Sequence, residues 1–113
     1  MGKPHDPHAK EMEDLLHTLW KSNYGTLLER LKILRAAQEK LAVDSLDDQT
    51  RKDAEDAAHK LAGILGTFGL PHGSALASRI EAWLASETAP GAECAPQFVS
   101  WLDELEAIIA SRP

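Results

Sequence analysis

The feature that most restricts the fold is a helical spacing of apolar residues along almost the whole chain. Between residues 54 and 68, apolar side chains recur every three or four positions, which places them on one face of a helix. They are Ala54, Ala57, Leu61, Ile64, Leu65 and Phe68. No segment shows the alternation of apolar and polar residues, rich in β-branched types, that is typical of strands. The pattern predicts an all-α protein.

The same spacing predicts four bundle helices, preceded by an extra N-terminal helix or a helical extension. The helical segments are expected to begin near Ala9, Leu27, Asp48, His72 and Pro96. A break or kink is expected at residues 22–25, and a loop at residues 87–96. Asp47 or Asp48 is a plausible N-cap for the third segment, which Gly69 and Pro71 would end near Thr67 or Phe68. Short connections favour an antiparallel up-down-up-down bundle.

Length and charge limit the class of protein. The 113 residues suit one domain, which we place at residues 9–113 after a flexible tail at residues 1–8. The net charge of −6 argues against binding to nucleic acid or to anionic membranes. The single cysteine excludes an intramolecular disulfide, and no ligand set has the spacing of a metal site. With no apolar run long enough to span a bilayer and no signal peptide, we expect a cytoplasmic protein.

Two glycines follow a histidine on one face of the third segment. On a helix of about 100° per residue, Gly63 lies about 40° from His59, Gly66 about 20° to the other side and Ala62 about 60° away. The apolar stripe lies on the opposite side, so this face points to solvent. Glycine inside a helix costs about 1 kcal/mol relative to alanine. Because two glycines lower the stability of the helix, we infer that they serve another purpose, which is to let a partner approach His59 closely.

An exposed imidazole of this kind is suited to carry a phosphoryl group. A histidine side chain titrates near pH 6.5, so it is largely a neutral nucleophile at pH 7. Lys60 could reach the phosphoryl oxygens, or an acidic rim on the partner. Glu55, one turn earlier, could accept a hydrogen bond from Nδ1 of His59 and leave Nε2 to attack. Arg79 is a further candidate for the docking surface.

These residues resemble the histidine-containing phosphotransfer (HPt) domain of bacterial two-component phosphorelays. The resemblance rests on His59-Lys60-Leu61-Ala62-Gly63, then Gly66-Thr67-Phe68-Gly69, and on the following helix with Leu76, Ala77, Ile80 and Glu81. Many members have lysine where this chain has Ala62. Lys60 is then expected to take over that electrostatic role.

The resemblance implies a phosphocarrier rather than an independent enzyme. His59 would accept a phosphoryl group from a receiver-domain aspartate and pass it to another receiver, or back. Response-regulator receivers or a hybrid histidine kinase would be the partners, and Lys60, Gly63 and Gly66 would belong to the docking surface. The receiver would supply Mg²⁺, and the chain would need no cofactor of its own. We expect a monomer.

Two other functions remain open from the sequence. The chain could be the phosphoacceptor module of a larger histidine kinase, or a helical interaction module without phosphotransfer. The sequence names neither the cognate kinase and receiver nor the direction of phosphate flow.

Overall fold

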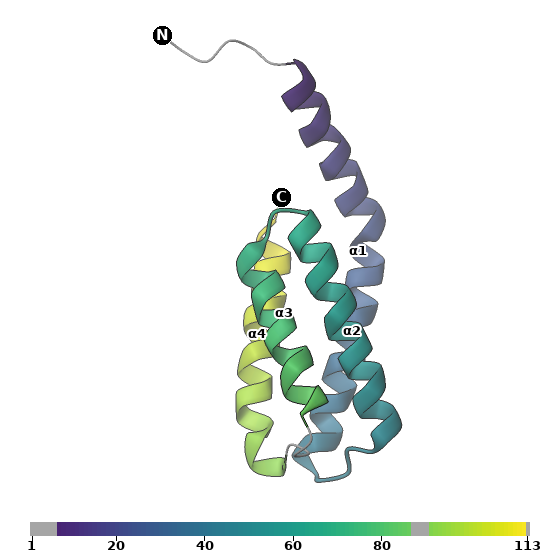
Figure 1. Cartoon of the computed structure of the whole chain (residues 1–113), viewed down its shortest axis with the longest axis vertical. Coiled ribbons are helices and arrows are strands. Elements are labelled where there is room, and N and C mark those ends of the chain that lie inside the picture. The colour runs from purple at the N-terminus through teal and green to yellow at the C-terminus, as the bar shows by residue number, and fades with distance from the viewer. Residues whose placement is uncertain (1–6, 87–90, 113) are drawn as a thin grey trace.

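A computed structural model describes residues 7–86 and 91–112. Four α-helices account for most of them: α1 (Pro7–Ala42), α2 (Asp48–Thr67), α3 (Pro71–Ala85) and α4 (Ala95–Ser111), with a short 3₁₀ turn at Ala92–Cys94 before α4. The described residues contain no strand. The helices form an antiparallel bundle in which α2 packs against α1 and α3, and α4 packs against the same two helices (Figure 1).

The first helix is continuous, so the break expected at residues 22–25 is wrong. Gly25 lies inside α1, between Trp20 and Leu27, which are both buried in the core. Their burial on either side of the glycine outweighs its low helix propensity. The N-terminal part of α1 is thus the helical extension, and it projects past the ends of the other helices (Figure 1).

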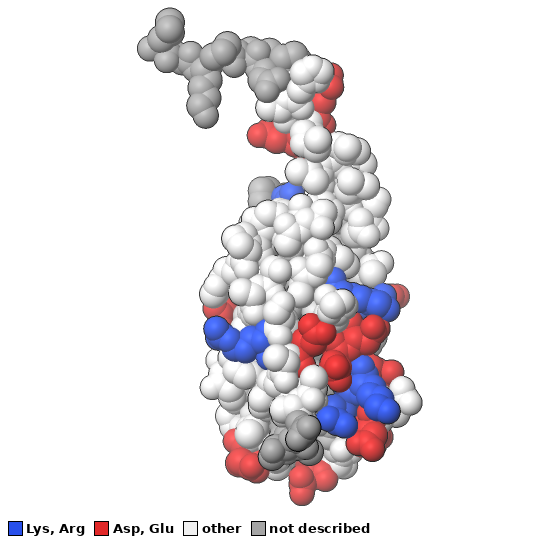
Figure 2. Space-filling model, viewed as in Figure 1, with Lys and Arg blue, Asp and Glu red and all other residues white. Residues whose placement is uncertain are grey.

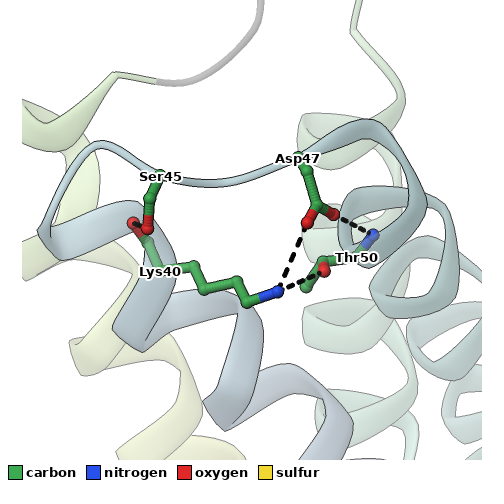
Figure 3. A network of polar contacts seen from close by, with 4 residues as sticks. All are labelled: Lys40, Ser45, Asp47 and Thr50. Atoms are coloured by element: carbon green, nitrogen blue, oxygen red, sulfur yellow. Dashed lines mark hydrogen bonds and ion pairs between the residues drawn. The ribbon is translucent and has the colours of Figure 1, made fainter.

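The second helix has well-defined ends, as expected. Asp47 is its N-cap, with Oδ1 accepting a hydrogen bond from the Thr50 backbone N–H at 2.6 Å. Lys40 at the end of α1 donates to Asp47 Oδ2 and to Thr50 Oγ1, while its carbonyl accepts from Ser45 (Figure 3). Hydrogen bonds from Thr50, then the charge of Lys40, lower the pKa of Asp47 to about 2. At the other end Gly69 has a φ of +72°, and Pro71 opens α3.

The core lies where the apolar spacing predicted it, with small differences. Ala54, Ala57, Leu61, Leu65 and Phe68 are buried, whereas Ile64 is half-buried. Ala58, which was not assigned to the stripe, is fully buried. Its small side chain allows the close contact of α2 with its neighbours.

The remaining boundaries differ by one or two residues. Pro7 and His8 already belong to α1, so the helix begins before the expected Ala9. The last helix begins at Ala95 rather than Pro96. Of the predicted loop, residues 87–90 lie outside the described residues, as do residues 1–6 of the predicted tail.

Candidate functional site

The imidazole of His59 lies on the outer surface of α2, with 70% of its side chain exposed. The preceding residues Ala57 and Ala58 and the following Leu61 face the core and have no exposed area. The predicted outward orientation is therefore confirmed. The apolar stripe fixes it, since burying that stripe turns the opposite side of the helix to solvent.

The two glycines differ in what they contact. A Cβ added at Gly63 would meet no heavy atom within 4 Å, so the surface one turn after His59 is open main chain. A Cβ at Gly66 would lie 3.3 Å from Ser74 Oγ, and this hydroxyl donates to the Ala62 carbonyl at 2.7 Å. Gly63 is thus part of an open strip, whereas Gly66 also allows α3 to approach α2.

The histidine ring is held by a carboxylate from the neighbouring helix. Nδ1 of His59 lies 2.9 Å from Oε2 of Glu81 on α3, whose side chain is 29% exposed. The prediction that Glu55 is the partner of Nδ1 is therefore wrong, because the carboxylate comes from Glu81 on α3. The two helices run antiparallel about the turn at Leu70, which lies midway between positions 59 and 81. That symmetry about the Gly69–Pro71 break was the signal in the sequence that could have identified Glu81.

Glu81 also accounts for the chemistry that the ring can perform. A carboxylate accepts only, so Nδ1 must carry the proton of a neutral ring that hydrogen-bonds to Glu81. Nε2 then holds the free lone pair, and no described residue forms a hydrogen bond with it. An exposed nucleophilic nitrogen, fixed in orientation and beside open main chain, is suited to attack an electrophile that another molecule presents.

Comparison with known proteins identifies the family of the chain. The Hpt domain family matches residues 24–111, most of the chain. The chain belongs to this family. Hpt domains carry phosphoryl groups in two-component signalling, where they interact with receiver domains and kinases.

One curated relative supports the assignment. Protein RcaC of Microchaete diplosiphon is 35% identical over 69 residues, which are 61% of this chain. The match spans only 11% of that longer protein. No solved structure is significantly similar to the chain.

Lys60 of this Hpt domain lies beside a carboxylate of its own helix. Its Nζ is 2.8 Å from Oδ2 of Asp56, and this contact, followed by the nearby charge of Arg30, lowers the pKa of Asp56. Lys60 is 46% exposed, so the pair is open to exchange with a partner's charges. Lys60 lies beside His59 on the helix surface, as predicted, but its ammonium is paired with Asp56.

An apolar groove between α1 and α2 adjoins the open strip at Gly63. Leu19 and Asn23 of α1 face Gly63, Ile64, Thr67 and Phe68 of α2, with Arg30 and Lys60 at one end. Leu19 is 41% exposed despite its size. Sequence reasoning missed Arg30, because only the packing of α1 on α2 brings it to this surface. Its Nε is buried and has no hydrogen-bond partner within the described part of the chain.

The structure also gives the positions of the other predicted residues. Ala62 is half-buried against the core, and Arg79 is exposed on α3. Glu55 lines a shallow hollow with His59, Glu81, Asp56 and Lys52. Figure 2 shows acidic side chains gathered over α2 beside α3, with basic side chains to either side.

Two features are absent from residues 7–86 and 91–112. These residues contain no group of three or more His, Cys, Asp or Glu side chains arranged to hold a metal ion. None of the helices described there is both long and apolar enough to cross a membrane.

Proposed function

We propose that the chain is a cytoplasmic, monomeric phosphorelay intermediate in which His59 accepts a phosphoryl group from a receiver-domain aspartate. It then passes the group to another receiver, or back. The observation that carries this proposal is the exposed ring of His59, held at Nδ1 by Glu81 with Nε2 left without a partner.

The proposed step is an in-line displacement at phosphorus. The lone pair of His59 Nε2 forms the new N–P bond, while the bond from phosphorus to the aspartyl oxygen breaks and the carboxylate leaves with its electrons. The ring is then cationic, because Nδ1 keeps its proton on the side of Glu81. Because this chain offers only positioning groups, we propose that the receiver supplies the Mg²⁺ that neutralises charge on the moving group.

The receiver would dock over the open strip and the α1–α2 groove. Gly63 allows its phosphorylated loop to approach the main chain of α2, and Leu19 with Ile64 offers an apolar surface to cover. Lys60 and Arg30 would meet the acidic groups around the receiver's aspartate. We also propose the exposed Arg79 of α3 as a docking contact.

The proposal is tested by incubating the chain with a panel of receiver domains carrying labelled aspartyl phosphate. We expect acid-labile, alkali-stable label on this chain. His59→Gln should abolish the label and leave the helical circular dichroism unchanged. His72→Gln is the matched control, because His72 is equally exposed and also contacts a carboxylate, Glu104 at 2.7 Å. No transfer from any receiver would instead favour an interaction module without phosphotransfer.

A second candidate is the phosphoacceptor module of a larger histidine kinase. The match to a small part of the much longer RcaC shows that a segment similar to this one occurs within a longer protein. This candidate predicts labelling of His59 by ATP only when a separate ATP-binding kinase domain is added. Labelling by phosphorylated receivers alone would favour the relay intermediate.

A further inference from the structure

The hollow beside His59 is lined by more acidic than basic side chains. The hollow beside the ring is lined by the carboxylates of Glu55, Asp56 and Glu81 and by one ammonium, that of Lys52. Lys60 neutralises Asp56 through the 2.8 Å ion pair, and the nearby charge of Arg30 on α1 also acts on Asp56. Glu55 and Glu81 then remain as the acidic groups of the hollow, with Lys52 as its cation.

These carboxylates act on a phosphorylated ring in two ways. A phosphoryl group carries nearly two negative charges at neutral pH, so Glu55 and Glu81 repel it. Glu81 also stabilises the positive charge that the ring gains when Nε2 is phosphorylated and Nδ1 remains protonated. Both effects favour departure of the group rather than its retention.

The protonated ring is the better leaving group. When the N–P bond breaks toward an acceptor oxygen, Nε2 takes the electron pair, and a ring already protonated at Nδ1 leaves as neutral imidazole. An unprotonated ring would have to leave as an imidazolide anion. Resting on the proposed function, we infer that Glu81, assisted by Glu55, keeps phosphorylated His59 in this labile form, so that the domain hands its phosphoryl group on instead of storing it.

The inference can be tested without a receiver. Potassium phosphoramidate transfers its phosphoryl group to imidazole nitrogen as ammonia leaves, and the His59 signal in the ³¹P NMR spectrum is the one missing from His59→Gln. The measurement is the rate of phosphoryl loss from His59 as a function of pH. The rate falls as the ring loses its proton, and the midpoint of that fall reports how strongly the ring holds it.

Glu81→Gln keeps a hydrogen-bond acceptor for Nδ1 and removes the charge. We expect it to lower the midpoint by about half a pH unit, which slows phosphoryl loss about threefold at pH values well above both midpoints. Glu55→Gln should give a smaller shift in the same direction. Glu104→Gln is the control of equal charge change, since its partner His72 lies nine residues before Glu81 on α3, and it should leave the midpoint unchanged.

Midpoints in Glu81→Gln and Glu55→Gln that equal the unaltered chain, or lie above it, would overturn the inference. Because the loading reagent replaces the receiver, this outcome is separate from failure of the proposed function. If the proposed function fails, no receiver labels His59, but the pH profiles of the chemically loaded protein can still be measured.

Discussion

Replacing Gly63 with alanine is expected to make the protein more stable, although the glycine lies within the candidate site. Glycine in a helix interior is about 1 kcal/mol less favourable than alanine. The added Cβ would meet no heavy atom within 4 Å, so no steric cost offsets the gain. For a domain of this size, 1 kcal/mol corresponds to a rise in Tm of about 4–6 °C.

Gly66→Ala is the matched comparison within the same helix. Its Cβ would lie 3.3 Å from Ser74 Oγ, and moving that hydroxyl strains its hydrogen bond to the Ala62 carbonyl. The rise in Tm should therefore be smaller than for Gly63→Ala. Thermal unfolding followed by circular dichroism at 222 nm measures both. A Tm of Gly63→Ala that is unchanged, or below that of Gly66→Ala, would refute the reasoning.

Docking at the open strip is tested by a larger side chain at position 63. Gly63→Leu should keep the fold at least as stable as the unaltered chain, since leucine is a good helix former and the site is open. It should slow phosphotransfer from a receiver at least tenfold, because its side chain would occupy the strip that the partner must approach. Transfer at the original rate in a folded Gly63→Leu protein would show that the open strip has no role in docking.

Three further outcomes follow from the packing and charges. Phe98→Ala, which empties a fully buried position packed against Trp83, should lower the free energy of unfolding by about 3–5 kcal/mol in urea titrations. The pKa of Asp47 is lowered from 3.8 to about 2. Its carboxylate therefore stabilises the fold above pH 3.8, and this contribution is lost as the pH falls toward 2. Asp47→Asn should remove that part of the acid dependence of Tm. Asp56→Asn releases Lys60 from its 2.8 Å ion pair, which frees the ammonium to meet a receiver. We expect faster transfer from a receiver to His59 in single-turnover assays. A rate at or below the original would be the contrary result.

Local signals in the sequence were sufficient for most of the secondary structure and for the orientation of the face that carries His59. The apolar spacing of residues 54–68 gave α2 and its buried side, and this by itself turned His59 and Gly63 outward. The caps at Asp47 and Gly69 were readable because a cap depends on neighbouring residues in the chain. The break expected in α1 failed where burial on both sides of Gly25 outweighed a local preference.

Contacts between helices were decided only by the tertiary structure. The spacing along one helix gives the direction of each side chain around that helix's axis, but not the height at which a neighbouring helix packs against it. Glu81 therefore replaced Glu55 at Nδ1 of His59, and Arg30 of α1 joined the groove beside Lys60. The sequence determined that a histidine faces solvent above open main chain. The packing of α3 and α1 on α2 decided which charges surround it, because side chains from different helices meet only once the core has set the register between them.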